Sequence, residues 1–287
     1  MRKIIIVFIV IFSLGAIFVY HYSKFNDRKL HVVFCDVGQG DAIFLRTPKG
    51  SDILIDGGPN NSVLSCLLGH MPFWDRDLEL VILSHPHADH LNGLIEVAKR
   101  YKIKSFATEN LKNNTASFRV LIDEIKKQNI KIQYLHTGDR FSFKDGLILE
   151  IVGPSREFIG ETSPTGMIGE SSEFANILTL FNYKDFSLFL TGDSQKEGIK
   201  DAILSGFLQD IDVLQVPHHG SKTGLDSEIL SYLKPELAVI SVGKNNKYSH
   251  PAKEIIEILR NQEIKTLRMD QNGEIEIMTD GINWIVE

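Results

Sequence analysis

The chain has 287 residues, of which 43% are hydrophobic and 24% charged, proportions typical of a globular protein able to bury a substantial core. Its formal net charge of −6 argues against tight, non-specific binding of nucleic acid through a broad basic face. It does not exclude an enzyme that handles phosphodiesters through bound metals. Cys35 lies in an apolar run and is interpreted as a small buried side chain, while a Cys35–Cys66 disulfide is an alternative that the pattern does not support.

Residues 1–22 are predicted to form a membrane anchor. Arg2 and Lys3 precede an almost purely apolar stretch, Ile4–Tyr20, and about 17 helical residues at 1.5 Å each span roughly 26 Å, just enough for a bilayer core. The stretch is long for a signal peptide and no A-x-A-like site follows it, which favours an uncleaved signal anchor. A cleaved signal peptide, which would make the protein secreted, is the main alternative, and a buried soluble helix is the least favoured.

The charges beside this segment indicate its orientation. Arg2 and Lys3 favour a cytoplasmic N-terminus and therefore a domain outside the cytoplasm. Basic residues on the other flank, at positions 24, 28 and 29, keep a cytoplasmic domain as the fallback. Residues 23–29 are interpreted as a polar linker, and residues 30–287 as one globular domain.

The first half of that domain has the pattern of a β-meander followed by alternating helices and strands. Short β-branched and aromatic runs separated by turn residues predict strands at 31–36, 41–47 and 52–56. After a short helix at 62–68, a buried strand is expected at 78–83 and an amphipathic helix at 91–100. A strand at 103–106, a helix at 116–127 and a strand at 132–135 complete this half.

The second half repeats this plan. Strands are expected at 147–152, 177–182 and 187–190, followed by alternating helices and strands from residue 195 and by short strands near 266–268, 274–278 and 283–286. The segment 155–172, rich in Gly, Ser, Thr and Pro, is predicted to be a long loop. If each half supplies one sheet with helices on one face, the result is a mixed α/β (α+β) fold, a four-layer αββα sandwich behind one N-terminal hydrophobic helix.

Four candidate metal ligands stand within six residues: His85, His87, Asp89 and His90. His85 and His87 are two apart at the end of an extended strand, where side chains at i and i+2 point the same way and can reach one cation. Asp89 and His90 follow at the start of the predicted helix, beside the first pair. A polar turn with ordinary hydrogen-bonded histidines is the unfavoured alternative.

These residues form the H-x-H-x-D-H motif, and the chain is identified by it as a member of the metallo-β-lactamase superfamily. Leu54–Gly58, with Asp56 at a strand end, and Thr191–Asp193 resemble two further superfamily motifs. The hydrolase domain of ComEC competence proteins is more similar still, from about residue 30 to the C-terminus. That similarity lies in Asp36–Ala42, Val216–Thr223, Ile240–Gly243, His250-Pro251, Met269–Gly273 and Thr279–Gly281.

The resemblance implies two divalent metal ions, Zn²⁺ or Mn²⁺, held by nitrogen and carboxylate ligands. Asp193 would bridge both ions, and Asp89 would bind one and orient a hydroxide shared by the two metals. His250 is expected to ligate a metal, with contact to substrate as its alternative. At least one of His218 and His219 belongs to the site, as a ligand or as a group that stabilises the oxyanion or protonates the leaving group.

The roles of surrounding residues are less specific. Asp56 is expected to orient ligand histidines rather than to bind metal. Asp41 and Gln39 suit the site and an ordinary turn equally well. Ser221 follows a glycine that would let the backbone approach a ligand. Lys222, Lys244 and Lys247 lie on predicted loops, where each lysine either contacts phosphate or is an ordinary solvated surface residue.

The chain departs from the family in two respects. Many superfamily members have a histidine just before the strand that leads to the bridging aspartate, but segment 171–176 contains none. Asn176 occupies this place instead, and it is expected either to contact the substrate or to cap the backbone. The first metal is therefore expected to have one ligand fewer or a different ligand. ComEC also carries its hydrolase domain behind a multi-helix channel, whereas this chain has a single hydrophobic segment and is not expected to be a DNA channel.

The combined expectation is a metal-dependent hydrolase, most plausibly a phosphodiesterase or DNA nuclease, since the ComEC-like motifs accompany extracytoplasmic DNA handling in competence and DNA uptake. One alternative is hydrolysis of a cell-envelope phosphodiester polymer or a lactone. Another is a non-catalytic accessory protein at a membrane, which the intact Asp89, His90 and Asp193 argue against. The partners expected are the membrane and DNA or another phosphodiester. No protein partner can be inferred.

Overall fold

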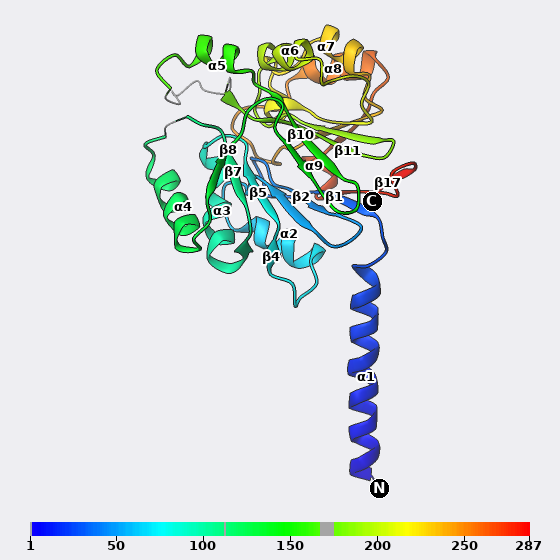
Figure 1. The fold of residues 1–287 in the computed structure, drawn as a ribbon. Helices are drawn as coiled ribbons and strands as arrows, with labels where there is room; N and C mark the ends of the chain where they lie inside the picture. The colour runs from blue at the N-terminus through cyan, green and yellow to red at the C-terminus, as the bar shows by residue number, and fades with distance from the viewer. Residues whose placement is uncertain (1, 112, 167–174) are drawn as a thin grey trace.

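A helix projects from a layered domain in the computed structural model, which describes residues 2–111, 113–166 and 175–287 (Figure 1). This helix, α1, covers Arg2–Lys24, and its segment Lys3–Lys24 is long and apolar enough to cross a membrane, with none of its membrane-length window buried. The N-terminal hydrophobic helix is therefore confirmed, and it extends into the segment that we predicted to be linker.

The first sheet has eight strands in the order β17-β16-β1-β2-β3-β5-β7-β8. The predicted meander is antiparallel, and β3, β5, β7 and β8 are parallel. The last two strands of the chain also join this sheet, with β16 antiparallel to β1, so the two halves of the chain do not each supply one complete sheet. The strand bounds are β1 Leu30–Phe34, β2 Ile43–Arg46, β3 Asp52–Ile55, β5 Leu80–Leu83, β7 Phe106–Thr108, β8 Ile132–Tyr134, β16 Ile275–Thr279 and β17 Trp284–Val286.

The second sheet has seven strands in the order β15-β14-β13-β12-β11-β10-β9. Its meander is antiparallel, and β12 to β15 are parallel. Two short strands, β4 Asp77–Leu78 and β6 Lys102–Ile103, pair separately. The strand bounds are β9 Arg140–Ser142, β10 Ile148–Gly153, β11 Leu178–Tyr183, β12 Phe186–Leu190, β13 Val213–Gln215, β14 Leu237–Ile240 and β15 Lys265–Arg268.

Three hydrophobic cores hold four layers together, which confirms the predicted αββα sandwich (Figure 1). One core lies between the sheets, where Phe34 and Phe181 are fully buried. The second joins the first sheet to α2 Ser62–His70, α3 Ala88–Arg100 and α4 Ala116–Lys127. The third joins the second sheet to α6 Lys196–Leu204, α7 Ser227–Leu233 and α8 Lys253–Asn261. Alternate strand residues face the two cores because side chains alternate across a sheet.

The prediction of a loop at 155–172 is wrong for its first half, where helix α5 covers Arg156–Thr162. The Ser155 hydroxyl caps this helix by accepting from the Phe158 N–H at 3.1 Å. The same serine is bound by Asp201 of α6, a tertiary contact with no local trace in the sequence. Residues 163–166 of the predicted loop form a turn in which the Gly166 N–H donates to the Ser163 carbonyl. The rest of that loop, residues 167–172, lies outside the described residues. A short helix, α9, also covers Met269–Asn272.

The strand directions separate α1 from the carboxyl edge of the first sheet. β1, β3, β5 and β7 all run the same way, so their carboxyl ends share one edge. Helix α1 joins the sheet through residues 25–29 at the amino end of β1. Five residues of β1 at about 3.3 Å each therefore put roughly 17 Å between the end of the linker and that edge.

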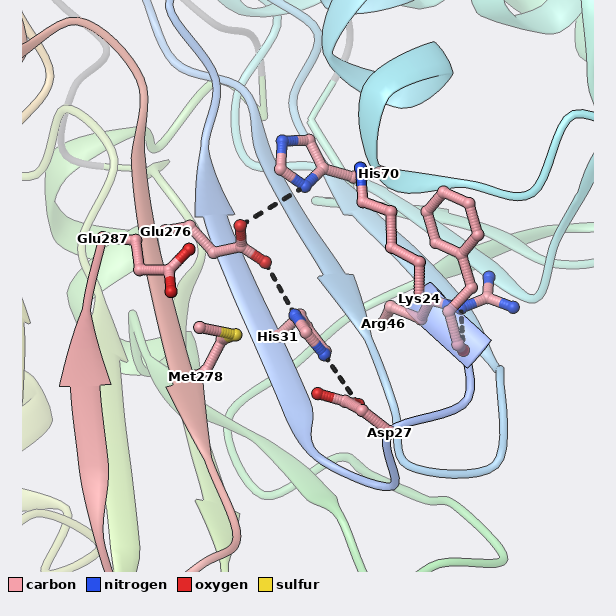
Figure 2. A pocket seen from close by; sticks show the side chains of 9 residues that line it. Lys24, Asp27, His31, Arg46, His70, Glu276, Met278 and Glu287 are labelled. Atoms are coloured by element: carbon pink, nitrogen blue, oxygen red, sulfur yellow. Dashed lines mark hydrogen bonds and ion pairs between the residues drawn. The ribbon is translucent and has the colours of Figure 1, made fainter. Parts of the chain in front are cut away.

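The junction between α1 and the domain is held by a chain of charged groups (Figure 2). The His31 ring bonds the Glu276 carboxylate at 2.6 Å and the Asp27 carboxylate at 3.0 Å. Glu276 also lies 3.7 Å from the His70 ring of α2. These side chains line a cavity of about 220 Å³ between the linker and the edge of β16. The linker is thus tied to β1, β16 and α2 rather than free.

We expect this junction to make stability pH-dependent. Burial opposes the charge on His31, but its hydrogen bonds with Glu276 and Asp27 prevail and raise its pKa. A histidine with a raised pKa contributes stability below its ordinary pKa and loses it as pH rises through the folded value. The melting-temperature difference between the full chain and His31→Asn should therefore shrink from pH 6 to pH 9. A difference that grows with pH would contradict the assignment.

The two cysteines form a disulfide, contrary to our interpretation of Cys35 as an unpaired buried side chain. Cys35 follows β1, and Cys66 lies in α2, which packs on the same sheet, so their Cα atoms come within 5.7 Å. The disulfide depends on how α2 packs on the sheet. The sequence spacing of 31 residues does not reveal whether the two cysteines lie close together in the folded chain.

Loss of this disulfide should destabilise the domain. Closing a loop of 31 residues in the unfolded chain predicts a contribution of about 3–4 kcal/mol to the free energy of unfolding. We expect Cys66→Ser to lower this free energy by about that amount in urea titrations. In a thiol titration of the unfolded wild-type chain, free thiols should be detected only after reduction. Two free thiols before reduction would show that the disulfide does not form.

Candidate metal centre

The H-x-H-x-D-H motif lies where β5 ends and α3 begins. His87 is the N-cap residue of α3 with an extended backbone, and the helix begins at Ala88, three residues earlier than predicted. The ring centroids of His85 and His87 are 4.4 Å apart, and those of His85 and His90 are 4.2 Å apart. The extended segment and the first helical turn thus bring three imidazoles together at the carboxyl edge of the first sheet.

The second sheet supplies the opposite wall of the site from two tight turns. Asp193 follows β12 in a turn where Gly192 has φ +47°, and a Cβ there would lie 2.5 Å from the Asn176 amide oxygen. His218 and His219 follow β13 and have positive φ values of 50° and 56°. Non-glycine residues rarely adopt this conformation, and it concentrates at functional sites. The backbone is held by His218 N–H, which donates to Gly192 O at 2.8 Å.

Two clusters of potential metal ligands share Asp193. His85, His87 and Asp193 form the first, with 3.7 Å between His85 Nε2 and Asp193 Oδ2. Asp89, His90, Asp193 and His219 form the second, in which Asp193 Oδ1 lies 3.3 Å from His90 Nε2 and 3.4 Å from His219 Nε2. In each cluster the ligand atoms lie within 4.8 Å of one another. The two oxygens of one carboxylate therefore face different clusters.

The unpaired atoms of these side chains indicate that a cation fits between them. His85 Nε2, His90 Nε2, His219 Nε2 and Asp193 Oδ1 are buried without a hydrogen-bond partner. Buried polar atoms are nearly always paired, and four that converge at one place are unusual without a ligand. The opposite ring nitrogens are already engaged: His90 Nδ1 with Asp56 at 2.8 Å and His219 Nδ1 with the Ser241 carbonyl at 2.8 Å. This arrangement leaves each Nε2 free to bind a metal.

The pKa shifts at the site follow from burial and mutual charge. Burial and the neighbouring His90 hold the pKa of His85 well below its ordinary value. For His219, burial opposes the charge, but Asp193 dominates and raises the pKa to about 9. For Asp193, burial is likewise outweighed by His219 and His90, which hold its pKa well below its usual range. A cation that binds here displaces protons from the rings, so metal affinity should fall at low pH.

Asp56 lies behind the ligands. It is buried with φ 60°, accepts from the Ser84 backbone N–H at 2.7 Å and its hydroxyl at 2.5 Å, and bonds the His90 ring. Asp41 also lies in this layer, with Oδ1 3.7 Å from His219 Nδ1. Asp41 and Asp56 form a third group with His90. Of the two sequence interpretations of Asp41, the structure supports a place at the site.

Two neighbours of the site were not singled out from the sequence. Gln215, at the end of β13, donates to Asp41 Oδ2 at 2.8 Å and accepts from the backbone N–H groups of Thr191 and Gly192. Glu109 follows β7 and is buried, which raises its pKa to about 8. Both are polar residues at the end of an apolar strand, the same signal that marks His85. The sequence alone does not reveal that these strand ends, one from each sheet, lie beside the site.

Asn176 supports the turn that presents Asp193. Its amide nitrogen donates to the carbonyls of Ile177 at 3.0 Å and Thr191 at 2.7 Å, and its oxygen accepts from the Asp193 N–H at 3.2 Å. These contacts match the backbone-capping alternative. His218 Nε2, by contrast, lies 3.7 Å from Asp193 Oδ2, the oxygen that faces the first cluster.

The remaining predicted site residues lie at the border of the site. The His250 ring centroid is 5.8 Å from that of His218, and Nδ1 is buried without a hydrogen bond, but His250 is not part of the ligand clusters found among the described residues. Its role as a ligand stays a prediction. Ser221 is buried and bonds Thr223, whereas Lys222, Lys244 and Lys247 are exposed. Gln39 Oε1 accepts from the Gly243 N–H at 3.3 Å.

The fold and the paired clusters define a metallohydrolase-type centre, and the model of the metallo-β-lactamase superfamily matches residues 35–244. The chain belongs to this superfamily. Its sheets also resemble solved structures at low identity: the metallo-β-lactamase fold protein YhfI from Bacillus subtilis, with TM-score 0.53, 12% identity and coverage of 83% of this chain and 95% of that one. Zn²⁺-bound PqqB from Methylobacterium extorquens is also similar, with a TM-score of 0.51 and 10% identity. That comparison covers 83% of this chain and 97% of the PqqB chain.

Within the superfamily, the chain is similar to competence proteins. It is 29% identical to ComE operon protein 3 of Bacillus subtilis over 84% of this chain and 32% of that protein. Recombination protein 2 of Haemophilus influenzae is 28% identical over 89% of this chain and 30% of its own length. The chain thus spans about a third of the length of these relatives. A shorter match, to the exodeoxyribonuclease WalJ of Streptococcus pneumoniae, is 29% identical over 24% of this chain and 26% of that protein.

Loss of the Asp56 carboxylate, which bonds the ring of the candidate ligand His90, should weaken metal binding although His90 itself is unchanged. Asp56→Asn keeps the size of the side chain but loses the charge that orients His90, and such changes typically lower metal affinity about 10–100-fold. Competition with a chromogenic chelator measures this affinity. Asp210→Asn changes an exposed carboxylate that is not part of the clusters. It is the matched control and should bind metal as the wild type does. Equal affinity in Asp56→Asn would contradict the orienting role.

Proposed function

We propose that this protein is a metal-dependent phosphodiesterase that acts as a nuclease outside the cytoplasm while anchored in the membrane. The observation that carries the proposal is the pair of ligand clusters joined by Asp193. His85, His87 and Asp193 would hold the first ion, and Asp89, His90, His219 and Asp193 the second. Nitrogen and carboxylate ligands without thiolate suit Zn²⁺ and Mn²⁺.

His218 is the best candidate to replace the histidine that segment 171–176 lacks. It approaches the same Asp193 oxygen as His85 does, at the same distance of 3.7 Å. Its side chain is also 22% exposed, more than His85, His90 or His219, so it can meet substrate. We assign it to the first cluster, where it would serve as a fourth ligand to the ion or contact the substrate.

Two ions in these clusters would lower the pKa of a water between them and place positive charge beside a phosphoryl oxygen. The protein's own groups would orient the reactants. The Asp89 side chain is 32% exposed, so it can accept a hydrogen bond from the attacking water at the mouth of the site. His250 lies next to His218 and outside the clusters found among the described residues. It would contact the leaving group if it does not serve as a further metal ligand.

A phosphodiester polymer that arrives from the water fits the architecture better than a membrane lipid. The site lies at the carboxyl edge of the sheet, whereas α1 joins the amino end of β1. The exposed Lys222, Lys244 and Lys247 lie on the turns that flank His219 and His250, where they can meet phosphates. The competence proteins and the exodeoxyribonuclease among the relatives support DNA as this polymer. The net charge of −6 indicates binding through this local site rather than through a broad basic face.

The location is supported by two features. Helix α1 has the length and composition of a membrane span. The Cys35–Cys66 disulfide is typical of compartments outside the reducing cytoplasm. Both agree with the orientation predicted from Arg2 and Lys3, with the domain outside the cytoplasm.

Activity should depend on the first cluster. We expect His87→Ala in the full chain to lose at least about 100-fold in hydrolysis of bis-p-nitrophenyl phosphate and single-stranded DNA with Mn²⁺ or Zn²⁺, because misplaced or missing metal removes a dominant electrostatic contribution. The matched control, His136→Ala, changes a histidine away from the clusters and should be fully active. Circular dichroism checks that both variants fold.

The outcomes separate the alternatives. Retained phosphodiesterase activity in His87→Ala would overturn the assignment of the site. Cleavage of lactones or of an envelope polymer, with DNA left intact, would keep the metal centre and overturn the nuclease proposal. A chain that binds metal but hydrolyses none of these substrates would favour the accessory protein.

A further inference from the structure

An aromatic loop lies on the domain beside the membrane helix. Between α2 and β4 the chain contains Phe73 and Trp74, whose exposed fractions are 62% and 43%. Leu68 of α2 is 56% exposed nearby in the chain. Large aromatic side chains at the tip of a short loop are costly to leave in water, and adjacent pairs of this kind mark interaction surfaces. The catalytic proposal does not use them.

This loop contacts α1 directly. The Trp74 ring centroid lies 5.3 Å from that of Phe18, and the Phe73 ring is 5.8 Å from that of His21 in an edge-to-face arrangement. Phe73 and Trp74 are themselves 4.7 Å apart. Just beyond them, Lys24 Nζ donates to the carbonyl of Gly69 at 3.4 Å. The loop therefore runs alongside the last turns of the helix instead of ending above it.

The length of the apolar stretch sets the depth of these contacts. A bilayer core of about 30 Å requires about 20 helical residues at 1.5 Å each, and Ile4–Tyr20 supplies about 17. The whole stretch is needed to cross, so Phe18 must lie at the boundary between the acyl chains and the headgroups. A ring in contact with Phe18 lies at the same depth. Trp74 can then avoid the bilayer only if α1 does not span it.

We propose that the loop Pro72–Asp75 is a second membrane contact that inserts into the headgroup boundary of the bilayer beside α1. Tryptophan is enriched at this depth because its ring is apolar and its N–H is polar. The exposed basic residues Lys24 and Arg76 flank the loop, as expected beside anionic headgroups. The inference rests on the part of the proposed function in which α1 spans the membrane.

Two contacts would fix the orientation of the domain, whereas a single helix on a free linker would allow it to rotate and tilt. The chain Asp27–His31–Glu276, with His70 beside Glu276, already makes the junction rigid (Figure 2). Helix α1 and the loop between α2 and β4 lie on the lower side of the domain in Figure 1, opposite α6, and would meet the bilayer there together. The metal centre at the carboxyl edge of the sheet is thereby held in the aqueous phase.

The protein's two tryptophans allow a direct test with the full chain in phospholipid vesicles. Trp284→Phe keeps Trp74 as the only tryptophan. The reference protein carries Trp74→Phe, Trp284→Phe and Leu204→Trp, which moves the fluorophore to an 87% exposed position on α6. Phospholipids brominated on the acyl chains should quench the first protein by about half or more, since its ring lies at the interface, and leave the reference unchanged. Iodide in the buffer should quench in the opposite order.

A second pair of variants tests the loop itself. Phe73→Asp in the Trp284→Phe background should remove the lipid quenching of Trp74, because a charged residue disfavours insertion. Phe207→Asp in the same background is the matched control. It replaces a phenylalanine that is 40% exposed near α6, and it should leave the quenching intact.

Each other result would overturn the inference. Quenching of Trp74 by iodide but not by brominated lipid would place the loop in water. Protection from both quenchers would mean that a second copy or another protein covers it. Vesicle flotation is measured in parallel, and protein that fails to float would refute the membrane span itself, whereas loss of hydrolysis would refute only the catalytic part of the proposed function.

Discussion

The carboxylate of Asp193 is the group on which the geometry of the centre depends. It comes from the second sheet, yet one oxygen faces His85 and the other faces His90, both from the first sheet. The two sheets must therefore pack in one register for either cluster to exist. Large apolar side chains between them, such as Phe34 and Phe181, exclude water and hold that register. The same packing makes the buried histidines and carboxylates interact strongly, because they lie in a medium of low polarity.

A layer of polar residues behind the ligands converts this packing into a defined arrangement. Asp56 engages the outer nitrogen of His90, and the Ser241 carbonyl engages that of His219. Asn176 and Gln215 hold the backbone around Thr191–Asp193. These hydrogen bonds fix the ligand rings and the turn that carries Asp193, so little reorganisation would be required to bind an ion. Preorganisation of this kind is what enables a metal centre to act on charge that develops during a reaction.

The direction of the first sheet separates the candidate centre from helix α1. Parallel strands bring the polar residues that follow them to one edge, and the linker enters at the other end of β1. Sequence position does not reveal this separation, since five strands and one helix lie between residues 25–29 and the motif at 85–90. Helix α1 and the candidate centre therefore lie at opposite ends of β1.

Local patterns were sufficient for the elements that depend on local interactions. The alternation of apolar and polar residues placed nearly all of the strands within a few residues, and the helical spacing after His90 identified α3, although its start at Ala88 was missed. Helix α5 was missed because its stability comes from the Ser155 cap and from Asp201, while the surrounding composition is that of a loop. The entry of β16 and β17 into the first sheet was missed as well, since strand pairing across more than 200 residues leaves no local periodicity.

The sequence by itself determined the type of centre and the residue types that build it. Four candidate ligands within six residues are close in space whatever the rest of the chain does, and the H-x-H-x-D-H motif also identified the superfamily. Only the tertiary structure decided which distant groups join them. In the folded chain, His219 lies with Asp89 and His90, and His250 lies beside His218. The Asn176 side chain bonds the backbone, and Cys35 and Cys66 form a disulfide. The physical reason is that these contacts cross between sheets, turns and layers, and their geometry is set by packing rather than by spacing along the chain.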